Sequence, residues 1–158
     1  MAVPIIADET LSSAAQTIDI EIPDLDLVEV YLSAYFNSQN SDYYVYINQD
    51  YTNAHYYRQR YYANNGAAAA ADTNNSPHMF AADLGFLAKI TIACNGQKYP
   101  SIIAEGSSIY DTDEIAVWAA GIIYTDSNLS SIDEVRLHAG VANAFGIGTR
   151  YIVRDLTL

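Results

Sequence analysis

The chain has 158 residues, of which 51% are hydrophobic and 16% are charged, and its formal net charge is -12. This length suits a single domain that folds without a disulfide or a structural metal, and this composition excludes global disorder. Nine of the 19 acidic residues lie in the first 50 positions, which contain no Lys or Arg, so nucleic acid is not an expected partner. The sequence also has no membrane-spanning run of roughly 20 apolar residues and no basic N-terminal region of a secretory signal. We therefore expect a protein that is made in a cytoplasm and does not enter a membrane.

The first half of the chain shows the apolar–polar alternation that is typical of half-buried strands. The segment TIDIEI (17–22) places three isoleucines on one face, and LVEVYLSAYF (27–36) alternates in the same way. In DYYVYIN (42–48) the aliphatic face is opposed by Tyr44 and Tyr46. We expect all three segments to be strands.

The stretch AHYYRQRYY (54–62) suits a strand because of its tyrosine content. One face would carry Tyr56, Arg58, Arg60 and Tyr62, and the other would carry His55, Tyr57, Gln59 and Tyr61. Neither face is aliphatic, which favours an edge strand or a strand that a neighbouring subunit covers. The turn-rich residues 64–78 are predicted to be a loop.

The second half adds further strand signals. FLAKITIAC (86–94) alternates with Cys94 facing inward as an inert core residue, and Asn95-Gly96 is a strong hairpin signal before a returning strand at 99–110. The segment IAVWAAGIIY (115–124) is apolar on both faces and is predicted to be a central strand. Residues 79–87 are read as one or two helical turns, and two last strands are expected at 131–139 and 148–156. About nine strands and no long helix indicate an all-β sandwich or barrel.

We find no catalytic, cofactor-binding or metal-binding constellation in the sequence. The three histidines, His55, His78 and His138, have no metal-ligand spacing and are interpreted as exposed polar positions; zinc would require them to converge with carboxylates. Two carboxylate clusters are interpreted as turn-forming residues, with calcium as the alternative: Asp24 with Asp26, and Asp111 with Asp113 and Glu114. There is no GxSxG motif and no phosphate-binding glycine loop. We therefore predict that the protein is not an enzyme and uses no cofactor.

Tyrosine is the most unusual feature of the composition, since eight of the 14 tyrosines fall between residues 43 and 62. Tyrosine offers a large contact area at a small entropy cost and is enriched at interfaces. The tyrosine-rich strands are therefore interpreted as a surface that another molecule covers. A protein partner and a stacked sugar remain open at this point.

The order of the segments resembles the small β-sandwich domains of structural proteins in tailed bacteriophages, in head decorations and tail appendages. The similar stretches are ETLSSAAQTIDIEIPD, then LVEVYLSAYF, then Asn48, Asp50, Asn53 and Tyr56, then WAAGIIYTDSNLSSIDEVRL, and finally ANAFGIGTRYIVRDL. The chain departs from the pattern at Arg154-Asp155, where those domains have an aromatic residue and a glycine. It departs again at Cys94-Asn95, where they have an asparagine and a tyrosine.

This resemblance implies a single jelly-roll-like sandwich, and the strand pattern above gives it about eight to nine antiparallel strands at residues 17–158. From the apolar stretch AVPII (2–6) we expect residues 1–16 to be an N-terminal arm that anchors the chain to a neighbour. The resemblance also implies a non-enzymatic virion protein, a capsid decoration (cement) protein or tail component, on the exterior of the particle. The expected partners are copies of the chain, in a trimer, and the major capsid or tail proteins. The alternative is a receptor- or carbohydrate-binding module, a lectin-like tail adhesin that takes a host glycan. The expected interface residues are Val3, Ile5, Ile6, Tyr44, Tyr46, Tyr56, Tyr57, Arg58, Arg60, Tyr61 and Tyr62.

Overall fold

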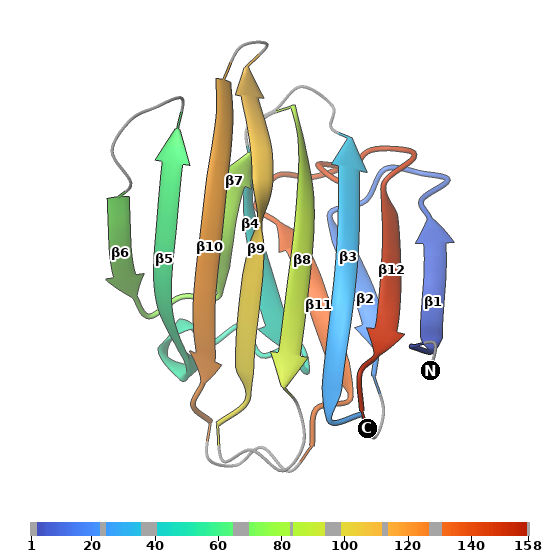
Figure 1. Cartoon of the computed structure of the whole chain (residues 1–158), viewed down its shortest axis with the longest axis vertical. Coiled ribbons are helices and arrows are strands. Elements are labelled where there is room, and N and C mark those ends of the chain that lie inside the picture. Colours follow the sequence, from blue (N-terminus) through green and yellow to red (C-terminus); the bar gives the residue numbers. More distant parts are fainter. Residues whose placement is uncertain are drawn as a thin grey trace.

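The computed structural model describes residues 3–22, 25–35, 41–64, 70–82, 84–93, 99–111, 114–126 and 131–157. These residues form twelve β-strands and one short 3-10 helix, η1 (Asn53–His55), so the all-β class expected from the sequence is confirmed. Within them, no helix is long and apolar enough to cross a membrane. The strands build two antiparallel sheets that face each other as a sandwich (Figure 1).

The larger sheet has eight strands in the order β1-β12-β3-β8-β9-β10-β5-β6. Their bounds are β1 (Ile5–Thr10), β12 (Arg150–Asp155), β3 (Leu27–Tyr35), β8 (Gly85–Ala93), β9 (Ser101–Asp111), β10 (Glu114–Tyr124), β5 (Tyr56–Asn64) and β6 (Ala70–Asn74). The smaller sheet lies behind it in the order β2 (Thr17–Glu21), β11 (Glu134–Ala139), β4 (Ser41–Ile47) and β7 (His78–Ala82) (Figure 1). The sandwich therefore has unequal layers of eight and four strands.

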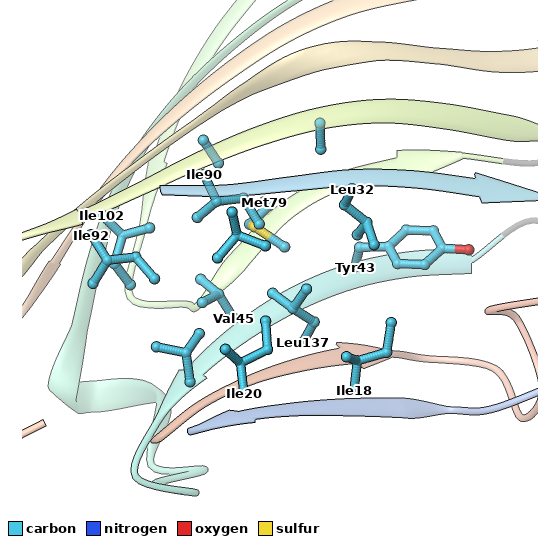
Figure 2. Packing of buried hydrophobic residues seen from close by; sticks show 14 of the residues in the cluster. Ile18, Ile20, Leu32, Tyr43, Val45, Met79, Ile90, Ile92, Ile102 and Leu137 are labelled. Atoms are coloured by element: carbon cyan, nitrogen blue, oxygen red, sulfur yellow. The ribbon is translucent and has the colours of Figure 1, made fainter. Parts of the chain in front are cut away.

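The core fills the space between the two sheets. Leu32, Ile90 and Ile92 project from the larger sheet toward Val45 and Leu137 of the smaller one, and all five are buried (Figure 2). The alternation expected for residues 17–22 and 27–35 is confirmed, because the buried positions in β2 and β3 are the aliphatic ones. In β4 the expected inward residues Tyr43, Val45 and Ile47 are buried, and Tyr46 on the other face is buried as well. Phe36, Cys94 and the Asn95-Gly96 turn lie outside the described residues, although β8 and β9 do pair as antiparallel neighbours.

Three expectations about secondary structure need correction. The expected loop at 64–78 contains β6, which pairs with β5 in register from Arg58↔Asn74 to Tyr62↔Ala70. Of the residues read as helical turns, 79–82 belong to β7 and 85–87 to the start of β8. Strands β6 and β7, together with β1, raise the count from about nine to twelve. Because β6 takes the edge of the larger sheet, β5 is an interior strand between β6 and β10 and not an edge.

The expected N-terminal arm contains β1, which pairs along β12 at the other edge of the larger sheet. An ion pair also links these two strands, since the Arg150 guanidinium donates to both carboxylate oxygens of Asp8 at 2.8 and 2.7 Å. In β12 the next residue, Tyr151, donates its hydroxyl hydrogen bond to Glu9 at 2.6 Å. Residues 5–10 are therefore part of the sandwich.

Candidate functional site

The outer face of the larger sheet, turned away from the smaller sheet, carries a mostly apolar surface, which the paired Lys89 and Glu105 interrupt on β8 and β9. Eight large side chains on the four adjacent strands β8, β9, β10 and β5 are each 43–61% exposed. We call this surface the outer patch: Tyr57, Tyr61, Leu87, Ile103, Ile109, Ile115, Val117 and Ile123. This is the side of the molecule that faces the viewer in Figure 1.

Strand register explains why these side chains share one face. Directly paired residues in a sheet point to the same side. The rows Leu87–Ser107–Val117 and Ile123–Tyr57 run across neighbouring strands, each member directly paired with the next. The residues between them along each strand, such as Trp118 in β10, point into the core instead. The patch thus arises because alternate residues of these strands point to opposite faces and both faces carry apolar side chains.

The same face carries charged side chains within the patch, at Lys89 and Glu105, and beyond it toward β1, and their signs balance. The described charged side chains of this region are three bases and three acids: Lys89, Arg150, Arg154, Asp8, Glu29 and Glu105. Lys89 pairs with Glu105 at 2.6 Å, and the Arg154 guanidinium lies 4.8 Å from the ring centre of Tyr31. In a chain whose net charge is -12, this face is close to neutral.

Two shallow hollows indent this face. One of about 490 Å³ lies between Tyr31, Leu87 and Ile152, and one of about 460 Å³ lies between Tyr61 and Val117. They meet at Glu105 and Gly106. Such open hollows suit the side chains of a macromolecule more than an enclosed small molecule.

Only some of the predicted interface residues are available to a partner. Tyr57 and Tyr61 belong to the outer patch, and Tyr62 is 39% exposed on the opposite side of β5. Val3, Ile5 and Ile6 are exposed at the β1 edge. The expectation of an exposed surface is corrected for Tyr46, Tyr56 and Arg58, which are buried because the Tyr56–Tyr62 side of β5 faces inward and Tyr46 is covered by neighbouring rings.

Arg58 and Arg60 form a partly buried cluster that fastens β6 and β7 to β5. Their guanidinium groups donate to the two carboxylate oxygens of Asp72 at 2.9 and 2.7 Å. The same groups lie 2.9 and 3.2 Å from Nδ1 of His78, whose Nε2 is 2.8 Å from the carbonyl oxygen of Phe80. Burial, with the adjacent Arg60 and Arg58, lowers the pKa of His78 despite the nearby Asp42. His78 is therefore a neutral structural residue and not the exposed polar position expected.

A pocket of about 260 Å³ opens beside this cluster, where Arg60, His78 and Asp42 meet the rings of Tyr62 and Trp118. Its polar groups already have partners: Arg60 pairs with Asp72, and Nε2 of His78 lies 3.3 Å from the Asp42 carboxylate. We read the pocket as the polar end of the sandwich.

The outer face of the smaller sheet carries an aromatic ladder. Tyr44 and Tyr46 stack with ring centres 6.1 Å apart, and Tyr51 lies 4.7 Å from Tyr46. His138 contacts both Tyr44 and Tyr46, at 6.2 and 5.9 Å. Arg136 lies beside Tyr51 and donates hydrogen bonds to the Tyr51 hydroxyl and to Asp19. Tyr46 is buried by its neighbours and Tyr44 is partly covered, whereas Tyr51 is 51% exposed at the end of the ladder.

The residues that carry the family resemblance around position 50 form a structural corner between β4 and β5. The Asp50 carboxylate accepts hydrogen bonds from the Tyr124 hydroxyl at 2.7 Å and the Thr52 amide at 2.9 Å, and it lies 2.5 Å from Nδ1 of His55. Burial alone would raise the pKa of Asp50, but these hydrogen bonds outweigh it and lower the pKa to about 2. The buried Tyr56 donates to the Asp50 carbonyl oxygen at 2.7 Å.

Asp126 joins this corner, so that ligand atoms of Asp50, His55 and Asp126 lie within 4.8 Å of one another. A metal ion bound there would have to displace the proton that His55 shares with Asp50 and compete with the donors that already engage Asp50. We therefore assign Asp50 and His55 to holding the corner. Asn48 has the same role, because its side-chain oxygen accepts from the amides of Asp133 and Glu134.

No protein-family model matches the chain, and no curated protein is significantly similar to it. The fold and the surfaces described above therefore carry the functional argument.

Proposed function

We propose that the protein is a non-enzymatic structural component of a tailed-phage virion, a capsid decoration protein or a tail component that acts through subunit contacts. The observation that supports it is the outer patch. Monomeric proteins rarely expose contiguous apolar surface beyond about 300–600 Å², and larger patches mark interaction sites. Eight half-exposed large side chains present on the order of 100 Å² each, which exceeds that range.

Strand β10 strengthens the case for a protein partner. Sequences that are apolar on both faces are typical of strands covered on both sides. In β10 the inward residues Ala116, Trp118 and Ile122 are buried under the smaller sheet, whereas Val117 and Ile123 on the other side are exposed. This pattern supports a second cover for β10 that comes from another molecule.

The assignment to a virion rests on the resemblance of the sequence to phage structural domains. It is tested by labelling purified particles from the source with an antibody against this chain and imaging them by electron microscopy. Label over the head supports a decoration protein, and label at the tail supports an appendage. Particles without label would overturn the virion assignment while leaving the outer patch as a protein contact.

The anchoring role proposed for the N-terminus needs a narrower test than removal of residues 1–16. That deletion would remove β1 and leave the edge of β12 unpaired. Removal of residues 1–4 spares β1. If the shortened protein still joins particles as well as the full chain, residues 1–4 are not the anchor.

A host glycan is the second candidate partner, and one group of residues favours it. Tyr57 and Tyr61 are half-exposed on β5, and Gln59 between them donates to the Tyr61 hydroxyl at 3.2 Å. Aromatic rings beside an amide suit sugar stacking. Purified protein should then bind glycans on an array and lose binding with Tyr57→Ala or Tyr61→Ala, whereas a protein contact predicts no glycan binding.

A further inference from the structure

We propose that the outer patch is covered by the outer patch of a second copy of the chain, related by a two-fold axis, so that two larger sheets pack face to face. This inference rests on the proposed function in one respect, that the patch is a protein contact, and it names the partner. It does not depend on the virion assignment. The resulting dimer would be a four-layer stack with the two smaller sheets outside.

The area of the patch matches what such a contact requires. A standard protein–protein interface buries roughly 800 Å² on each partner. The eight side chains of the patch, at about 100 Å² each, supply close to that amount before their polar neighbours are counted. Sheet faces commonly pack against each other about 10 Å apart with interdigitated side chains, so two flat apolar faces form a geometrically ordinary contact.

The distribution of charged side chains favours this face for self-association. Two copies of a chain with a net charge of -12 repel each other over most of their surfaces. The face that carries the patch is the exception, because its three described bases offset its three described acids. Identical copies therefore meet less net repulsion at this face than elsewhere on their surfaces.

The relief of the face is also compatible with two-fold packing. The two hollows have similar volumes, about 490 and 460 Å³, and meet at Glu105 and Gly106. Leu87 and Val117 project on either side of the small Ser107 in one row across the strands. In a two-fold contact each projection of one copy meets the same surface on the other, and each hollow receives a side chain from the partner.

The two-fold arrangement differs from the trimer that the family resemblance implies. A patch that contacts itself closes with two copies, whereas a cyclic trimer joins two different patches in each interface. The mass of the particle in solution therefore decides between them. A dimer has twice the 17.3 kDa of the chain.

The first experiment measures the mass of the purified full chain by analytical ultracentrifugation over a range of concentrations and salt. We expect a dimer that strengthens with salt, because screening removes the repulsion between net-negative chains and does not weaken apolar contacts. A chain that stays monomeric overturns the inference. A trimer also overturns it. If the monomer still decorates particles, the proposed function stands and another virion protein covers the patch.

The second experiment places a charge on the patch. Val117→Lys should raise the dimer dissociation constant by about tenfold or more, because a lysine ammonium cannot be buried unpaired in an apolar contact. The matched control is Ile147→Lys, since Ile147 is 69% exposed in the turn before β12 and lies off the patch. Equal effects of the two substitutions, or no effect of Val117→Lys, would overturn the location of the contact.

A charge exchange tests the centre of the face without adding bulk. Lys89→Glu leaves two acids side by side in each copy and should weaken the dimer, and Lys89→Glu with Glu105→Lys restores the pair and should restore the dimer. Both positions are solvent-exposed, so circular dichroism should confirm that the variants fold. If the exchanged pair fails to rescue a folded variant, the contact does not include Lys89 and Glu105.

Discussion

Val117 and Trp118 are consecutive residues of β10 that lie in opposite environments. The Trp118 indole is 4% exposed and stacks on Phe80 in the core, with ring centres 3.9 Å apart and an interplanar angle of 14°. The Val117 side chain is 61% exposed on the other side of the same strand. Two adjacent apolar residues therefore serve two different contacts, one within the chain and one that we assign to a second copy.

We expect Trp118→Ala to lower the free energy of unfolding by about 3–5 kcal/mol, because it removes a large buried ring and leaves a cavity beside Phe80. Val117→Ala should change the stability of the monomer by no more than about 0.5 kcal/mol. Urea unfolding at a concentration where the chain is monomeric checks both values. Equal losses would mean that Val117 is part of the core.

Gly106 in β9 provides the space that Trp118 occupies. A Cβ at this position would overlap the carbonyl oxygen of Leu87 and lie 2.7 Å from Cζ2 of Trp118. We expect Gly106→Ala to cost about 1–3 kcal/mol through overpacking.

The neighbouring Gly121 is the matched control for this substitution, since a Cβ there meets nothing within 4 Å. Gly121→Ala should be neutral or stabilise the chain by up to about 1 kcal/mol, because alanine in a strand loses less entropy than glycine. Thermal unfolding of the two variants measures the contrast. If Gly121→Ala lowers the free energy of unfolding by as much as Gly106→Ala does, the loss reflects chain stiffness and not the contact with Trp118.

The Asp50–His55 contact should be visible in the titration of His55. Its hydrogen bond to Asp50 raises the pKa of His55 above the ordinary value of 6.5. On the alkaline side, the stability that the contact contributes is complete below pH 6.5 and is lost as pH rises through the raised pKa of His55. On the acid side, it is lost as pH falls from 3.8 toward the Asp50 pKa of about 2. NMR titration should place the His55 pKa above 6.5.

The substitution that tests this contact is Asp50→Asn, which should return the His55 pKa toward its ordinary value and lower the free energy of unfolding by about 1–2 kcal/mol. The control is Thr125→Val, which removes a hydroxyl that donates to the His55 carbonyl oxygen at 3.0 Å and does not contact the His55 ring. It should leave the His55 pKa near its wild-type value. An unchanged pKa in Asp50→Asn would contradict the contact.

His78 should make the sandwich sensitive to mild acid. Burial and the two arginines lower its pKa from 6.5, so the folded chain binds fewer protons than the unfolded chain below that pH. Stability should therefore fall as pH drops from about 7 to about 5, by on the order of 1 kcal/mol. Urea midpoints across this range measure the effect. His78→Gln should flatten the profile, and an equally steep fall in that variant would assign the acid sensitivity to other groups.

The sequence predicted the elements that follow a simple alternation. Ile18 and Ile20 in β2 and Val45 in β4 were placed correctly because each alternates with polar neighbours. Strand β6 could not be found this way, since AADTN has no apolar period and forms by pairing with β5 and through the ion pairs of Asp72. The tyrosines of β5 were identified as unusual, but the face that turns inward depends on the long-range register with β10.

The outer patch was only partly foreseeable. The two apolar faces of residues 115–124 predicted a central strand, and β10 is one. The sequence does not show which face remains open, because that depends on the smaller sheet having four strands under a sheet of eight. The buried Arg58 and the partly buried Arg60 were missed for a related reason, since their partners Asp72 and His78 lie in the segment predicted to be a loop, residues 64–78.

The pairing of β1 with β12 has a consequence for how the chain is made. These are the first and last strands, and the register Ile5↔Arg154 joins residues near the two ends of the chain. Among the described strands β1 is made first and β12 last, so β1 has no strand partner until β12 has emerged from the ribosome. The closing of this edge therefore follows the synthesis of every other described strand, and nascent chains that lack an emerged β12 should leave β1 open to proteolysis.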